Sequence, residues 1–147
     1  MGDARNIVLL GAGFGGLALA EQLNDVAVSG KAAVTLVDRK RHFNMGFSLQ
    51  WVLMGRREAE EGMRSYASML ADGVRFVHDE IVAVDTEAKT VHTRTRRLPY
   101  DDLVIATGAA MDPGRIPGLG EASYNLCSVD HVVQLKQALS ESSRGRW

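Results

Sequence analysis

The sequence predicts an α/β fold with a parallel sheet, and three observations predict it. Continuous apolar stretches at 7–10, 33–37 and 103–106 are typical of strands buried on both faces, as in parallel sheets. Four glycines follow the first stretch, within 11–16, and strong helix formers follow them at 17–23. Strand, glycine turn, helix and strand make a βαβ unit, whose crossover should be right-handed.

The middle of the chain has a less regular pattern. Residues 39–57 are mixed and aromatic, with neither a helical nor a strand period, so we expect a loop with one short helix. Residues 58–71 are rich in Glu, Arg, Met, Ala and Leu, and Gly73 stands where a left-handed glycine would end a helix. We therefore expect a helix over 58–71, followed by a short strand at 74–77.

The following segment predicts a small antiparallel β-meander. Apolar and polar residues partly alternate at 81–84, 90–95 and 98–100, and polar turns separate the three stretches. The stretch at 103–106 is continuously apolar again, so we expect it to return to the parallel sheet.

The 147 residues fit a single domain and leave no room for a second one of full size. We expect that domain to occupy residues 1–112, followed by a Gly- and Pro-rich linker at 113–127. An exit helix is expected at 128–141, where Ser128 can act as the N-cap, and a tail without pattern at 142–147.

Composition excludes several function classes. The formal charge of −1 provides no basic field to hold nucleic acid phosphates. The longest apolar run, 7–20, is too short and too rich in glycine for a transmembrane segment. The single cysteine, Cys127, excludes an internal disulfide and favours a reducing, cytoplasmic compartment. The four histidines show no spacing typical of metal ligands, so we expect no metal site.

The glycines at 11–16 form the pattern GxGxxG between a strand and a helix. In this pattern Gly11 permits a tight turn, Gly13 lets a pyrophosphate approach the backbone, and Gly16 lets the helix pack against the strand. The N–H groups at the start of the helix, from Phe14 and Gly15 onward, attract phosphate. The pattern therefore predicts a dinucleotide site.

An acid at the end of the second strand strengthens this prediction. Asp38 lies 22 residues after Gly16, where a carboxylate can accept hydrogen bonds from both hydroxyls of an adenosine ribose. A 2′-phosphate would be repelled by Asp38, so an unphosphorylated ribose is favoured. The alternative is that the glycines only shape a tight turn, and the strand, helix and acid in register disfavour it.

The fingerprint alone does not separate FAD from NAD. A pure NAD-binding Rossmann domain would add further βα units after its second strand. Here a meander follows instead, and then the segment Tyr-Asp-Asp-Leu-Val-Ile-Ala-Thr-Gly at 100–108. An NAD-binding Rossmann enzyme stays open as the alternative.

The order of GxGxxG, strand-end acid, meander and YDxLVIATG resembles the FAD-binding domain of the pyridine nucleotide-disulfide oxidoreductases, flavoproteins with two dinucleotide-binding folds. The resemblance implies a Rossmann-like FAD-binding domain. It implies backbone contacts to FAD from Thr107 and Gly108, an adenine contact from the backbone of Ile81, and a place for Arg39 beside the adenosine.

Within that superfamily the segment 41–55 is most similar to sulfide:quinone oxidoreductases and flavocytochrome c sulfide dehydrogenases. The similarity places Ser48 near the flavin. The sequence departs from these groups at Phe47 and Gln50, where prolines are usual, and at Leu49, which replaces an asparagine. Met45 stands in the approximate place of the flavin-linking cysteine of the flavocytochromes, so we expect FAD to be bound without a covalent link.

Cys127 resembles the first cysteine of the sulfide:quinone group and is a candidate redox residue. A lone cysteine forms no dithiol, and a small side chain at a helix start is an equally good interpretation. No other catalytic residue is indicated.

The resemblance implies an N-terminal FAD-binding portion of a FAD/NAD(P)-dependent oxidoreductase that moves electrons or hydride through the flavin, of the sulfide:quinone or NADH:quinone type. NAD(P)H or quinone would be the co-substrate of the full-length enzyme, which would be cytoplasmic and peripheral to the membrane. We expect the chain alone to be incomplete and inactive and to retain FAD weakly. A further alternative is a truncated, non-enzymatic interaction module that associates with itself through the face left open by the missing half.

Overall fold

A computed structural model describes residues 4–142, which form two compact units. Within the described residues, the first unit contains 4–43 and 64–109, and the second contains 44–63 and 110–142. The domain boundaries expected from the sequence stay predictions. All but Ser142 of the tail expected at 142–147 lies outside the described residues.

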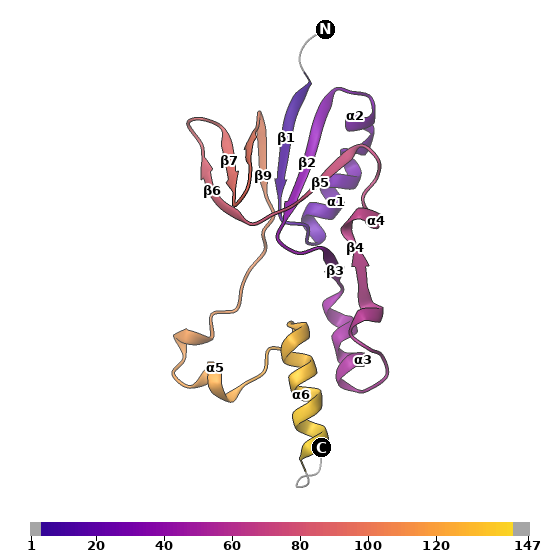
Figure 1. Cartoon of the computed structure of the whole chain (residues 1–147), viewed down its shortest axis with the longest axis vertical. Helices are drawn as coiled ribbons and strands as arrows, with labels where there is room; N and C mark the ends of the chain where they lie inside the picture. Colours follow the sequence, from indigo (N-terminus) through magenta and orange to yellow (C-terminus); the bar gives the residue numbers. More distant parts are fainter. Residues whose placement is uncertain (1–3, 143–147) are drawn as a thin grey trace. The chain divides into compact units, whose positions relative to one another are not determined.

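A four-stranded parallel sheet is the centre of the first unit (Figure 1), as predicted. Its strands are β1 (Arg5–Leu10), β2 (Ala32–Asp38), β5 (Val74–His78) and β9 (Asp102–Ile105). The order is β5-β2-β1-β9, so β1 and β2 are internal strands, and β9 pairs with β1 although more than 90 residues separate them.

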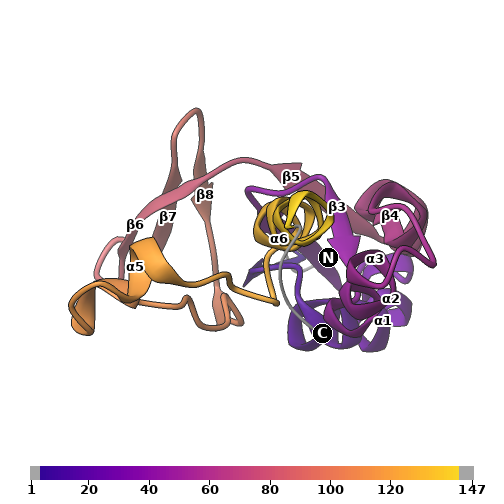
Figure 2. The same ribbon diagram turned by 90° about the horizontal axis from the view of Figure 1, so that it is seen from below.

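The two faces of the sheet are buried by different elements. Helices α1 (Phe14–Gln22) and α2 (Asn24–Val28) cover one face, where Leu9, Leu36 and Ala20 belong to one core cluster. The other face packs on the meander of β6 (Ile81–Asp85), β7 (Thr90–Thr93) and β8 (Arg97–Pro99). Figure 2 shows the meander on the left and α1 and α2 on the right. Two covered faces explain why β1 reads as a continuous apolar run.

The prediction of a helix over 58–71 is wrong. This segment forms a 3-10 turn (Glu60–Gly62), the short strand β4 (Met63–Ser65) and a single helical turn, α4 (Tyr66–Met69). The strand β4 pairs with β3 (His42–Asn44), which lies in the segment expected to be a loop. The Tyr66 N–H donates to the carbonyl of Arg41 at 3.1 Å. The Tyr66 side chain is buried, and its ring centroid lies 5.2 Å from that of Phe76. These long-range contacts outweigh the local helix propensity.

The second unit contains two helices that pack together. They are α3 (Leu49–Leu53), the short helix expected within 39–57, and α6 (Val129–Glu141), the expected exit helix. Leu49, Val52 and Val132 form their shared core. The N-cap residue of α6 is Ser128, but its side chain makes no capping bond, and only its carbonyl accepts the Val132 N–H. Two 3-10 turns, at Gly46–Ser48 and Pro113–Arg115, and the short helix α5 (Leu119–Ala122) complete the described elements.

Candidate dinucleotide site

The turn between β1 and α1 accepts only glycine at two of its positions. Gly11 has φ +96°, and a Cβ there would lie 2.5 Å from the carbonyl oxygen of Ala106 and 2.8 Å from the Cα of Thr107. A Cβ on Gly16 would lie 1.9 Å from the carbonyl oxygen of Gly11. The roles predicted for the first and third glycines therefore have a direct steric cause: the turn fits tightly against the end of β9 and under the first turn of α1.

Gly13 and Gly15 differ from these two because they face open space. Nothing lies within 4 Å of a Cβ built on Gly13, and only the Ala106 methyl approaches one on Gly15, at 3.9 Å. Gly13 is the N-cap residue of α1, and no side chain caps this helix. The first helical bond runs from the Leu17 N–H to the Gly13 carbonyl, so the N–H groups before Leu17 have no helical partner. This is the geometry that an anion needs at a helix start.

Phe14 begins α1 with an exposed ring. Its side chain is 66% exposed and packs edge-on against Phe43 of β3, with ring centroids 5.1 Å apart. The contact fixes the ring beside the turn. The backbone N–H of Phe14 stays among the N–H groups before Leu17 that have no helical partner.

Asp38 ties the second strand to the glycine turn. Its Oδ2 accepts the Ala12 N–H at 2.7 Å, and its Oδ1 accepts the Lys40 N–H at 2.8 Å. The carboxylate is half-buried, and since a carboxylate has about four acceptor sites, about two remain for a ligand. These two bonds fix the orientation of the Asp38 carboxylate and leave some of its hydrogen-bond acceptor sites free.

The other residues expected in the first unit lie near this turn to different degrees. Thr107 and Gly108 are exposed directly after β9, where Gly11 approaches Thr107, and Gly108 has φ +72°. Arg39 is exposed, and its carbonyl lies 3.0 Å from Nε2 of His78. Ile81 is half-buried at the start of β6 against the core of the meander.

Asp79 is a second carboxylate beside Asp38, and no motif in the sequence points to it. It is buried after β5, and its own N–H donates to the Asp38 carbonyl at 3.0 Å. The Thr95 hydroxyl and N–H and the Thr93 hydroxyl all donate to its Oδ2, at 2.6, 3.1 and 2.7 Å. These bonds, led by those from the hydroxyls of Thr95 and then Thr93, hold the pKa of Asp79 well below its usual range. The Asp79 carboxylate therefore fixes the meander to the parallel sheet.

Ser48 and Cys127 belong to the second unit. Ser48 is buried, and its hydroxyl donates to the Met45 carbonyl at 2.7 Å and lies 3.2 Å from Asn44 Oδ1. Cys127 is an exposed free thiol whose backbone N–H donates to Asn125 Oδ1 at 2.9 Å. Gly11 and Asp38, in contrast, belong to the first unit.

Two further findings concern the described residues, 4–142. They contain no group of three or more His, Cys, Asp or Glu side chains that could hold a metal ion. None of the helices over this range is both long enough and apolar enough to cross a bilayer.

Comparison with known proteins agrees with this fold. A family model described as pyridine nucleotide-disulphide oxidoreductase matches residues 5–144. The chain is 29% identical over 140 residues to the sulfide-quinone reductase of Aquifex aeolicus, covering 94% of this chain and 32% of that protein. The solved structure of the sulfide:quinone oxidoreductase from the same bacterium superposes with a TM-score of 0.79 at 26% identity, with the same coverages of 94% and 32%.

Two NADH-related proteins are similar as well. The type II NADH:quinone oxidoreductase of Staphylococcus haemolyticus is 23% identical over 147 residues, which cover 95% of this chain and 35% of that protein. NDH2 from Plasmodium falciparum, solved in complex with NADH, has the same fold, with a TM-score of 0.74 at 23% identity over 90% of this chain and 28% of that one. The chain thus spans about a third of the length of the curated relatives it matches.

Proposed function

Because this chain belongs to the pyridine nucleotide-disulphide oxidoreductase family, we propose that it binds FAD without a covalent link, through the turn after β1. The family binds FAD and NAD(P)H, and the chain is related to sulfide:quinone and NADH:quinone oxidoreductases. The chain would form the N-terminal, FAD-binding portion of an oxidoreductase of one of these two types.

The open N–H groups at the start of α1 would hold the FAD pyrophosphate. Gly13 would let the phosphates approach the backbone, and Phe14, Gly15 and Gly16 would donate their N–H groups. Because Ala12 donates its N–H to Asp38, the phosphate contacts would begin after that residue.

The adenosine half of FAD would lie beside Asp38. The free acceptor sites of its carboxylate match the two hydroxyls of a ribose, and Arg39 would flank the adenosine. The backbone of Ile81 would meet the adenine. The backbone of Thr107 and Gly108 would contact the cofactor next to the turn, since Gly11 approaches Thr107.

The flavin ring would supply the electron-pair transfer when bound, with NAD(P)H or a quinone as co-substrate of the whole enzyme. Ser48 would lie near the flavin, with its hydroxyl already donated to Met45, so it would contribute position and not a free donor. Cys127, an exposed thiol, remains the redox candidate of the chain.

The single observation that supports this proposal best is the contrast among the glycines. Gly11 and Gly16 are required by the fold itself, because a Cβ on either would overlap backbone atoms. Gly13 is not required by the fold: its φ is −74° and a Cβ would meet nothing within 4 Å. The space left in front of Gly13 therefore calls for a ligand that approaches the backbone.

The test is a fluorescence titration of the 147-residue chain with FAD and, in parallel, with NADH. We expect tighter binding of FAD. The variant Gly13→Ala should weaken FAD binding by about tenfold and leave the melting temperature unchanged, because a methyl group would occupy the phosphate approach. Gly16→Ala is the matched control, in which the melting temperature falls as well. Unchanged FAD affinity in Gly13→Ala, or preference for NADH, would contradict the proposal.

A further inference from the structure

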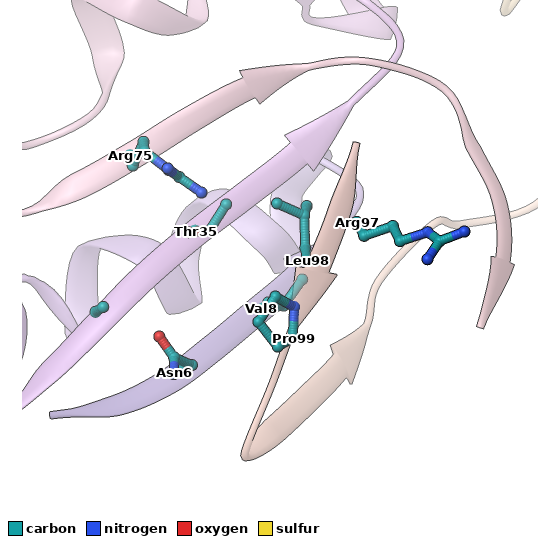
Figure 3. Close-up of a pocket in the computed structure, with 8 residues that line it drawn as sticks. Asn6, Val8, Thr35, Arg75, Arg97, Leu98 and Pro99 are labelled. Atoms are coloured by element: carbon teal, nitrogen blue, oxygen red, sulfur yellow. The ribbon is translucent and has the colours of Figure 1, made fainter. Parts of the chain in front are cut away.

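A small groove lies on the meander face of the parallel sheet, toward the beginnings of β1 and β2 (Figure 3). Its volume is about 220 Å³. Pockets for drug-sized ligands are larger, from about 300 Å³ upward. The glycine turn follows the opposite ends of the same strands, so this groove is separate from the candidate dinucleotide site.

The floor of the groove is a row of neighbouring side chains. The strand register pairs Val8 with Thr35 and Thr35 with Arg75, so these three stand side by side on one face, about 4.8 Å apart from strand to strand. The next row toward the carboxyl ends, Leu10 and Val37, is buried under the meander. The meander therefore covers the sheet only in part: Val8 is still buried, whereas Arg75 and the preceding row of Asn6 and Ala33 are exposed.

The polar side-chain groups of Asn6, Thr35 and Arg75 have no partner among the residues that the structure describes. Thr35 is only 8% exposed, yet its hydroxyl makes no hydrogen bond to any described residue. Among residues 4–142, no carboxylate lies within ion-pair distance of Arg75, and the side-chain amide of Asn6 is likewise without a bond. Solvent still reaches the Thr35 hydroxyl, which is not among the fully buried unpaired side-chain atoms, so a ligand in the groove could bond to it.

Arg75 and Arg97 both line the groove, and Arg75 is the one whose guanidinium extends over the sheet toward Thr35 (Figure 3). The Arg97 side chain points away from the other labelled residues. The nearby acids do not neutralise Arg75: Asp101 accepts the backbone N–H of Asn6 at 2.7 Å, and Asp102 pairs with Arg5 at 2.9 Å. A guanidinium next to a hydroxyl and an amide is a donor set suited to an oxyanion.

The apolar part of the lining selects among oxyanions. Ala33 of β2 and Pro99 of β8 are the exposed apolar residues of the lining, whereas Val8 and Leu98, which also line the groove, are buried. We propose that this groove binds a small carboxylate that has a short apolar chain, with the carboxylate on Arg75 and Thr35 and the chain on Ala33 and Pro99. Inorganic phosphate shares the charge of such a ligand but cannot use the apolar lining.

The test is an NMR titration of the 147-residue chain with butyrate, followed through the backbone amide signals. We expect saturable shifts at Asn6, Thr35 and Arg75, a much smaller response to inorganic phosphate, and none to butyramide, the uncharged analogue. Arg75→Gln should weaken butyrate binding by about tenfold or more, the usual worth of a hydrogen bond to a charged group. Arg97→Gln, the matched control, should change it by less than about twofold.

A second variant tests the hydroxyl of Thr35 without changing the charge of the groove. Thr35→Val removes the hydroxyl, keeps the shape and breaks no hydrogen bond of the free protein, so it should fold normally and bind butyrate several times more weakly. Equal binding of butyrate by Arg75→Gln and the parent chain would overturn the proposal. Binding of butyramide or phosphate as tight as that of butyrate would do the same.

Discussion

Asp38 is the last residue of β2 and Asp79 follows the neighbouring strand β5, and the protein uses the two carboxylates in different ways. Asp79 accepts four hydrogen bonds, three on Oδ2 and one on Oδ1, from the Glu80 N–H, and is buried. Asp38 accepts two backbone N–H groups and is half-buried. The acid whose acceptor sites are filled holds the fold together, and the acid with free acceptor sites is available to a ligand. The number of donors around a carboxylate, and not its place at a strand end, separates these roles.

The largest effect is expected on removing the saturated acid. Asp79→Ala removes the shared acceptor of the Thr93 and Thr95 hydroxyls, leaves Thr93 only the longer contact to the Arg96 carbonyl, and detaches the meander from β5. We therefore expect the melting temperature to fall by about 10 °C. Calorimetry measures this fall. The FAD affinity of the folded fraction, titrated well below the transition, should stay close to that of the parent chain. A parent-like melting temperature would break the comparison.

The next effect is expected at the unsaturated acid and on affinity. Asp38→Ala removes the acceptors proposed for the ribose hydroxyls, so FAD should bind about 30-fold more weakly. The melting temperature should fall by less than in Asp79→Ala, because only two backbone bonds are lost. Isothermal titration with FAD and a thermal scan of both variants give the two numbers. A larger stability loss in Asp38→Ala than in Asp79→Ala would reverse the assignment of roles.

A smaller effect is expected in acid. Because the pKa of Asp79 is lowered by the fold, the unfolded chain takes up its proton first, and stability present above about pH 4 is lost as the pH falls below that value. Asp79→Asn removes this contribution, so its stability should depend less steeply on pH between about 4 and 2. Urea unfolding at several pH values measures the slope. Identical slopes for the parent and the variant would show that Asp79 is not the group responsible.

The smallest effect is expected in alkali and reports on the charge of Asp38. Burial, and then the charge of Asp38, raise the pKa of Tyr66 to about 12. The unfolded chain therefore loses the phenol proton first, and stability falls by about 1 kcal/mol between pH 10 and 11. Tyr66→Phe should lose this fall, and Asp38→Asn should reduce it. Urea unfolding at pH 10 and at pH 11 checks the order of the three proteins.

Much of the fold could be predicted because its signals are local. The strands around Val8, Leu36 and Val104 are apolar on both faces, and the glycine pattern of the turn lies within six consecutive residues. The meander was indicated by alternation over a few residues at a time. These features need no knowledge of distant partners, and the structure contains all of them.

The parts that could not be predicted depend on distant partners. The segment 58–71 has the composition of a helix, but β4 pairs with β3 and Tyr66 bonds to Arg41, about 25 residues earlier. Asp79 looks like an ordinary turn residue until Thr93 and Thr95, 14 and 16 residues later, are placed around it. At the candidate site, the glycines and Asp38 were predictable, whereas the open space at Gly13 and the free acceptor sites of Asp38 depend on how the distant segments pack.

The strand order β5-β2-β1-β9 also has a consequence for synthesis on the ribosome. The first three of these strands are complete at residue 78, whereas β9 emerges only after residue 105. Until then β1 has an unpaired edge, and the Ala106 carbonyl against which Gly11 fits is still missing. We expect the nucleotide turn to be the last part of the sheet to become rigid during translation, a delay that arrested nascent chains of increasing length would make visible.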